Sequence, residues 1–257
     1  MAERKFVKPV KTARVPKSSR KSIPTKDEQL LNVPVAEEVR RLRVTSDSWR
    51  VLSIVGEFVW GFDNLQDVAG GASIFGSART KPGDPMYQAA EETGRLFAQA
   101  GIPVITGGGP GIMEAANKGA YEAKGISIGC NIELPHEQYT NQYLTRSLDF
   151  KFFFVRKTMF VKYAIGFVVF PGGYGTLDEL FEALTLMQTD KLTDFPIVLV
   201  GKAYWSGMTE WITSTMLREG KITPGDDKLF TVTDSPRTVV RTLLESRKRL
   251  GIATVGL

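Results

Sequence analysis

Cysteine and histidine are nearly absent from this chain, and their scarcity limits its chemistry. The 257 residues include one cysteine, Cys130, and one histidine, His136. A single cysteine excludes an internal disulfide and any multi-cysteine metal site. Because Cys130 lies in a strand-like run, we expect a buried, inert thiol. A single histidine argues against a metal centre and against a Ser-His-Asp mechanism.

Long apolar runs are also missing. No stretch approaches the roughly 20 apolar residues that a membrane-spanning helix needs, and the N-terminus has no hydrophobic signal core. We therefore expect no membrane segment and a cytoplasmic protein. The composition, 42% hydrophobic and 24% charged, fits one sizeable α/β domain or a domain plus extensions.

The positive charge is concentrated at the N-terminus. Residues 1–26 hold nine Lys/Arg and one acid, whereas the remainder holds 24 basic and 27 acidic residues. The folded body therefore offers no charge argument for binding nucleic acid. The basic segment, with three prolines and few apolar residues, predicts a disordered tail over residues 1–30. A solvated tail without a specific role is favoured over one that binds nucleic acid or acidic partners.

A peripheral helical extension is predicted over residues 31–68, followed by a Rossmann-like nucleotide-binding domain over 69–250. The stretch 35–43 has the charge spacing of a solvated helix. Residues 49–65 form a second predicted helix. Its apolar stripe is expected to pack on the main domain, and it consists of Leu52, Val55, Phe58, Val59 and Phe62.

Short β-branched runs alternate with helical patterns along the rest of the chain. Strands are predicted at 71–75, 102–106, 126–132, 168–170, 196–200 and 229–233. Helices are predicted at 85–100, 112–124, 150–164, 176–188, 204–218 and 236–250, with Gly101 and Gly125 closing the first two. Such alternation with short linkers indicates an α/β fold, a doubly wound parallel sheet with right-handed crossovers.

Three of the predicted strands end in turns rich in glycine: Gly76-Ser77, residues 107–111 and residues 172–176. Ligands of open parallel sheets bind outside the carboxyl ends of the strands, where the strand order reverses. Glycines can simply make tight turns, but three such turns favour one crevice for a nucleotide phosphate and sugar.

The third turn leads into an amphipathic helix. A strand, a glycine turn and a helix start together present free backbone N–H groups and the positive end of the helix dipole to an anion. The turn is neither a Walker loop nor GxGxxG, and it places Glu179 one turn into the helix. Residues Thr176 to Glu179 also fit a capping box, in which Glu179 would only bond the Thr176 backbone.

Three motifs carry a family resemblance: PGGYGTLDE at 171–179, GGGPGIMEAAN at 107–117 and FFVRK at 153–157. The chain from about 71 to 200 resembles the Lonely Guy family of cytokinin riboside 5′-monophosphate phosphoribohydrolases, often mislabelled as lysine decarboxylases. Its extensions resemble those of the longer bacterial members. Where short members have Gly-x-His, this chain has the residues 188–191, Gln-Thr-Asp-Lys, so the resemblance does not fix the base.

The resemblance implies an enzyme that hydrolyses the N-glycosidic bond of purine or cytokinin nucleoside 5′-monophosphates, such as AMP or N6-prenyl-AMP. The products are the free base and ribose 5-phosphate. It implies no metal and no cofactor, and a homodimer, for which the aromatic residues of 150–164 offer a surface. The alternative is a non-catalytic nucleotide or cofactor carrier of the same fold.

Site residues follow from the motifs and their chemistry. Glu179 is the predicted catalytic carboxylate, because cleavage passes through a cationic, oxocarbenium-like sugar. Arg156, also predicted as catalytic, is a fixed donor for phosphate or the leaving base, although a lone arginine is more often a solvated charge. Glu114 contacts ribose or only favours its helix start, and Met113 lines the base pocket or the core. The predicted substrate-binding residues are Gly76, Ser77, Gly108, Gly109, Met113, Glu114, Lys157, Gly172, Gly173, Tyr174, Gly175 and Thr176.

Overall fold

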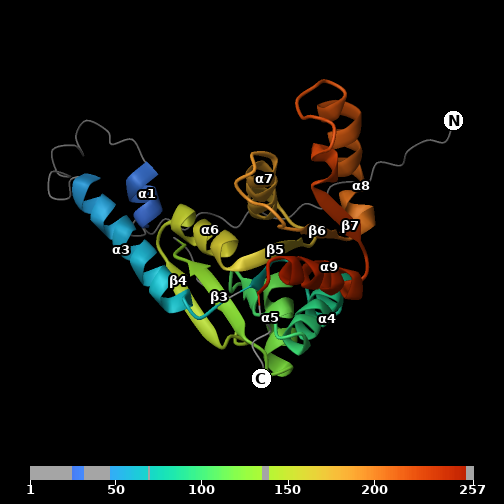
Figure 1. The fold of residues 1–257 in the computed structure, drawn as a ribbon. Helices are drawn as coiled ribbons and strands as arrows, with labels where there is room; N and C mark the ends of the chain where they lie inside the picture. Colours follow the sequence, from blue (N-terminus) through green and yellow to red (C-terminus); the bar gives the residue numbers. More distant parts are fainter. Residues whose placement is uncertain (1–24, 32–46, 69, 135–138, 253–257) are drawn as a thin grey trace, which may run out of the picture.

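The protein is built around a seven-stranded parallel sheet (Figure 1). The structure, a computed structural model, describes residues 25–31, 47–68, 70–134 and 139–252. The strands are β1 Gly71–Phe75, β2 Val104–Thr106, β3 Ser127–Ile132, β4 Arg146–Phe150, β5 Ala164–Val169, β6 Ile197–Val200 and β7 Phe230–Thr233. Their order is β4-β3-β2-β1-β5-β6-β7. The order reverses between β1 and β5, so the turns after β2, β1 and β5 are neighbours.

Helices cover both faces of the sheet, which confirms the predicted doubly wound fold. One face carries α4 Pro85–Gln99, α5 Ile112–Glu122 and α9 Pro236–Arg249; the other carries α6 Phe153–Lys162, α7 Tyr174–Gln188 and α8 Lys202–Trp211 (Figure 1). The chain after α8 continues as a π-helix, Ile212–Leu217, and a 3-10 turn, Asp226–Lys228. Successive residues of a strand point to opposite faces of the sheet and pack into separate hydrophobic cores. Ile74 packs under α4 and α5, and Phe75 packs under α6.

The edge strand β4 was not predicted. Its residues fall in the expected polar connection and at the start of the expected helix 150–164. The reason is the burial pattern of this strand: only Leu148 and Phe150 are buried, while its other three residues are polar and more exposed. The helix therefore begins at Phe153, and β5 takes over at Ala164.

Two further predicted boundaries are wrong. The backbone leaves α5 through Lys124, at φ +65°, rather than through Gly125, whose N–H bonds the Ala120 carbonyl at 2.9 Å. The disordered tail predicted over 1–30 is contradicted at residues 26–30, because Lys26–Leu31 form the helix α1. Thr25 and Glu28 make a capping box there, with N–H to side-chain distances of 2.9 and 3.3 Å. The tail before residue 25 and the predicted helix 35–43 lie outside the described residues.

The second helix of the extension, α3 Asp47–Leu65, packs on the domain through only two of the five residues of the predicted stripe. Leu52, Val55 and Val59 are 59%, 51% and 62% exposed, whereas Phe58 and Phe62 pack against the core. Apolar residues occur almost all round this helix, so their spacing does not select one side.

The homodimer that the family resemblance implies stays a prediction.

Cys130 is fully buried in β3, and burial raises the pKa of its thiol to about 12. This confirms the expectation of an inert thiol. In the described part of the chain, no helix is both long and apolar enough to cross a membrane.

Helices α4 and α5 approach closely because two glycines lie at their contact. A Cβ on Gly94 would overlap the Ala116 carbonyl oxygen, and one on Gly119 would overlap the Glu91 carbonyl oxygen. The obstacle in both cases is backbone, which cannot move aside as a side chain can. This contact holds the start of α5 beneath the strand ends.

We predict that Gly119→Ala destabilises the protein by at least about 2 kcal/mol, since the two helices must separate. The control is Gly207→Ala in α8, where a Cβ meets nothing within 4 Å. That change should stabilise the helix by about 0.5–1 kcal/mol. Urea unfolding of both variants measures the difference, and equal stabilities would contradict the close contact.

Candidate active site

Backbone hydrogen bonds of Ser77 join the three glycine turns. Its N–H donates to the Pro171 carbonyl at 2.9 Å, and its carbonyl accepts the Ile112 N–H at 3.1 Å. Ser77 follows β1, Pro171 follows β5, and Ile112 begins α5 after the β2 turn. Glycine is required around it, because a Cβ on Gly76 would lie 2.6 Å from the Ile112 side chain and one on Gly111 would overlap the Ser77 carbonyl. The predicted convergence of the turns is therefore present.

A buried polar network supports the turn after β2. Asn117 accepts from the Thr106 hydroxyl at 2.6 Å and from the Asn141 amide at 3.0 Å. The Asn141 backbone N–H donates to the Gly108 carbonyl at 2.9 Å. Gly108 has φ +70°, and a Cβ there would overlap Asn131. Sequence reasoning did not find these asparagines. Asn117 could have been found from the sequence, because it is the last residue of the motif at 107–117 and lies on the buried side of α5.

The turn after β5 is open where an anion would bind. Helix α7 begins at Tyr174 with Gly173 as its N-cap, so Tyr174 and Gly175 have no carbonyl one turn back within the helix. A Cβ on Gly173 or Gly175 would meet nothing within 4 Å, and the Tyr174 side chain is 93% exposed. At Gly172 a Cβ would overlap the buried Thr176 hydroxyl instead.

Tyr204 of α8 fixes this turn from outside the motif. Its hydroxyl donates to the Gly172 carbonyl at 2.6 Å. Because the peptide is planar and trans, the Gly173 N–H points the opposite way from that carbonyl. Sequence reasoning missed Tyr204, since nothing in the local pattern tells where a helix 32 residues further along will place a hydroxyl.

The capping box, which was the alternative role for Glu179, does not form. Thr176 is the third residue of α7, not its N-cap, and its N–H donates to the Gly173 carbonyl at 3.0 Å. Glu179 is 4% exposed, and its Oε2 has no hydrogen-bond partner within the described ranges. A carboxylate buried with a free oxygen costs stability unless something else uses it.

Burial raises the pKa of Glu179 to about 7, although the nearby Lys157 and Arg156 lower it. The carboxyl therefore changes its charge near neutral pH. A titratable group with such a shift at a strand-end crevice is a candidate for catalysis.

Arg156 is the fourth residue of α6 and lies between the glycine turn after β2 and Glu179. Its guanidinium stacks near the rings of Phe153 and Phe160, at 5.1 and 5.4 Å from their centroids. A Cβ on Gly107 would lie 3.8 Å from its Nη1. Its Nε is buried with no hydrogen-bond partner in the described ranges, and burial lowers its pKa while Glu179 raises it. Arg156 is thus no solvated surface charge.

Lys157 connects α6 to α7. Its ammonium lies 3.0 Å from an Asp178 oxygen and 2.6 Å from a Glu182 oxygen. Burial lowers its pKa, but the bonds to Glu182 and Asp178 outweigh that and raise it overall. The predicted substrate-binding lysine is therefore engaged with the helix that carries Glu179.

Glu114 and Met113 lie at the start of α5. The Glu114 carboxylate accepts from the hydroxyls of Tyr87, at 3.2 Å, and Tyr139, at 3.0 Å. Met113 covers the glycine turn, because Cβ atoms on Gly107 and Gly109 would lie 2.9 and 2.8 Å from its side chain. Both residues are therefore beside the β2 turn as predicted, and both alternatives for their roles remain.

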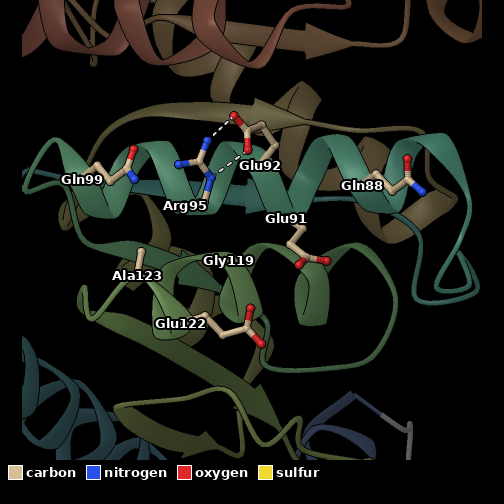
Figure 2. A pocket seen from close by; sticks show the side chains of 8 residues that line it. All are labelled: Gln88, Glu91, Glu92, Arg95, Gln99, Gly119, Glu122 and Ala123. Carbon is tan, nitrogen blue, oxygen red and sulfur yellow. Dashed lines mark hydrogen bonds and ion pairs between the residues drawn. The ribbon is translucent and has the colours of Figure 1, made fainter.

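A separate pocket of about 440 Å³ lies between α4 and α5 (Figure 2). Its main charged groups are already bonded: Arg95 pairs with Glu92 at 2.6 Å, and Glu91 pairs with Lys118 at 3.0 Å. The lining contains none of the predicted site residues. Among the described residues, no cluster of histidine, cysteine and acidic side chains is arranged to hold a metal ion.

Known proteins resemble the chain in sequence and in fold. A cytokinin riboside 5′-monophosphate phosphoribohydrolase of Mycobacterium tuberculosis is 28% identical over 162 residues, 61% of this chain and 84% of that protein. One from Arabidopsis thaliana is 27% identical over 164 residues, 62% of this chain and 75% of that protein. The solved structure of a Moco carrier protein from Chlamydomonas reinhardtii superposes with a TM-score of 0.53 at 22% identity, over 70% of this chain and 99% of that chain.

A family model described as "possible lysine decarboxylase" matches residues 113–243, about half of the chain. The match includes α6, the glycine turn after β5 and α7. The chain therefore belongs to this family, the Lonely Guy family that its motifs indicate.

Proposed function

We propose that this protein hydrolyses the N-glycosidic bond of a purine nucleoside 5′-monophosphate, releasing the base and ribose 5-phosphate. The observation that carries the proposal is Glu179, which is buried with a free oxygen beside the open start of α7. The relatives' shared name supports the same reaction. We propose adenine or a prenylated adenine as the base. The site residues described above do not distinguish between these two bases.

In the proposed complex, the 5′-phosphate binds at the start of α7. The backbone N–H groups of Gly173, Tyr174 and Gly175 are available there, and the helix dipole favours an anion. The Tyr204 bond to Gly172 supports this role, because it orients the Gly173 N–H without occupying it. The Thr176 hydroxyl, which lies against Gly172, is a further donor for the phosphate in this proposal.

The phosphate places the ribose toward Glu179, one turn into α7. As the bond from C1′ to the base nitrogen breaks, its electron pair goes to the base and positive charge develops on the sugar. An ionised Glu179 stabilises that charge more in the transition state than in the ground state. Water then adds its oxygen to C1′, and its proton balances the charge of the leaving base.

Arg156 acts on the other partner of the broken bond. Its guanidinium remains charged at neutral pH, so it donates hydrogen bonds rather than protons. Its unpaired Nε and its place between the β2 turn and Glu179 suit a donor to the leaving base or to phosphate. A carrier would need the anion site but not this pair, so the pair favours hydrolysis over carriage.

The test is a panel of nucleoside monophosphates, including AMP, GMP and isopentenyl-AMP, incubated with the full-length protein. We expect free base and ribose 5-phosphate in equal amounts from at least one purine nucleotide, measured by chromatography. Tight binding of every nucleotide without release of base would instead identify a carrier.

Glu179→Gln should lower kcat by about 10²–10⁴-fold while nucleotide affinity changes little, since the amide keeps the shape but cannot carry the charge. The control is Asp178→Asn, the neighbouring carboxylate, whose side chain is 60% exposed. Steady-state kinetics and calorimetry separate the two effects. Parallel losses of affinity and turnover in Glu179→Gln would assign the residue a structural role.

Glu179 should also make stability depend on pH. Its folded pKa of about 7 is above the ordinary 4.5, so the folded protein holds an extra proton between these values and loses stability as pH rises through them. Glu179→Gln should therefore be more stable than the native protein at pH 8, by roughly 3 kcal/mol. The difference should close near pH 4.5. Urea unfolding at several pH values measures it, and a constant difference would contradict the raised pKa.

A further inference from the structure

The start of α6, the helix that carries Arg156, is unfavourable by its own sequence. Its N-cap is Phe152, whose side chain has no oxygen to accept from the first free N–H groups of the helix. The first turn contains no acidic residue. Arg156 and Lys157 add two positive charges near the positive end of the helix dipole. This helix therefore needs acceptors and negative charge from elsewhere.

The N-terminal extension supplies both. Asp27 of α1 accepts the Phe153 N–H on its Oδ2 at 3.0 Å, and it is only 8% exposed. Glu57 of α3 accepts the Lys151 N–H at 2.5 Å and the Phe152 N–H at 3.2 Å. The two carboxylates come from elements 94 to 126 residues earlier in the chain. They accept from Phe152, the N-cap, and from Phe153, the first helical residue, and so satisfy two of the N–H groups that have no carbonyl partner within the helix.

The position of the Arg156 side chain depends on the geometry of the first turn of α6. Its guanidinium has its Nε unpaired and is located by the backbone of α6 and by the rings of Phe153 and Phe160. Phe153, the first residue of the helix, is thus both the donor to Asp27 and a stacking partner of Arg156. Fraying of the first turn would displace one wall of the guanidinium's site.

We propose that Asp27 and Glu57 are positioning residues for Arg156, through which the N-terminal extension holds the active site in its working geometry. The proposal rests on the proposed function of Arg156. Both carboxylates precede residues 113–243, the part that the family model matches, so this cap is an addition outside the matched region. The extension is then a component of the site rather than a peripheral appendage.

The experiment compares two full-length variants. Asp27→Ala combined with Glu57→Ala removes both caps. The control, Asp67→Ala, removes the bonds of 2.7 and 2.8 Å between the segment after α3 and Arg146 of β4, and leaves α6 untouched. We expect the double variant to lose at least tenfold in kcat. The control should stay within threefold of the native protein, with thermal unfolding reporting the stability of each.

A third variant, Asp27→Asn with Glu57→Gln, keeps the accepting oxygens. It should recover kcat to within threefold, because an amide oxygen also caps a helix. Hydrogen exchange of residues 150–157 should be faster in the alanine double variant than in the control. Turnover of the alanine double variant within threefold of native, an equal loss in Asp67→Ala, or an equal loss in the amide variant would each overturn the proposal.

The outcome is separable from that of the proposed function. If the native protein releases base from no nucleotide, the proposed hydrolysis fails. The positioning role is then judged by AMP affinity in calorimetry, which should fall at least tenfold in the alanine double variant and not in Asp67→Ala. Equal AMP affinities with equal hydrogen exchange would overturn it.

Discussion

The paired backbone bonds of Ser77 are the constraint on which the candidate site depends. They join the turn after β1 to Pro171 on one side and to the start of α5 on the other. Parallel strands bring three turns to one edge, but only such bonds fix their relative positions. Gly76 and Gly111 are required because side chains there would occupy the space of those bonds. The open start of α7 and the β2 turn therefore face a common site.

Charge at this site is set by burial. Glu179 and Arg156 are both buried, and their mutual attraction offsets only part of the free-energy cost of removing each charge from water. The result is a carboxyl that titrates near neutrality and a guanidinium with an unpaired Nε. Such groups cost stability in the empty protein. A substrate that carries a phosphate and develops positive charge on its sugar offers a partner for each.

The local patterns were sufficient for six of the seven strands and for the glycine turns, because strand burial and turn chemistry are properties of adjacent residues. They failed where contacts with residues distant in the sequence determine the local structure. The start of α6 was misplaced by three residues, since its caps, Asp27 and Glu57, lie far away in sequence. The buried face of α3 was predicted only in part, because apolar residues occur on most sides of this helix. Tyr204 and Asn141 were missed because each acts through contacts with residues that are distant in the sequence.

The central claim is that a nucleotide binds with its phosphate at the start of α7 and its sugar beside Glu179. The most direct test is a crystal structure of Glu179→Gln with AMP bound. We predict the phosphate within hydrogen-bonding distance of the N–H groups of Gly173 to Gly175, and C1′ next to the residue 179 side chain. AMP seated in the pocket between α4 and α5, or with its phosphate away from α7, would contradict the account.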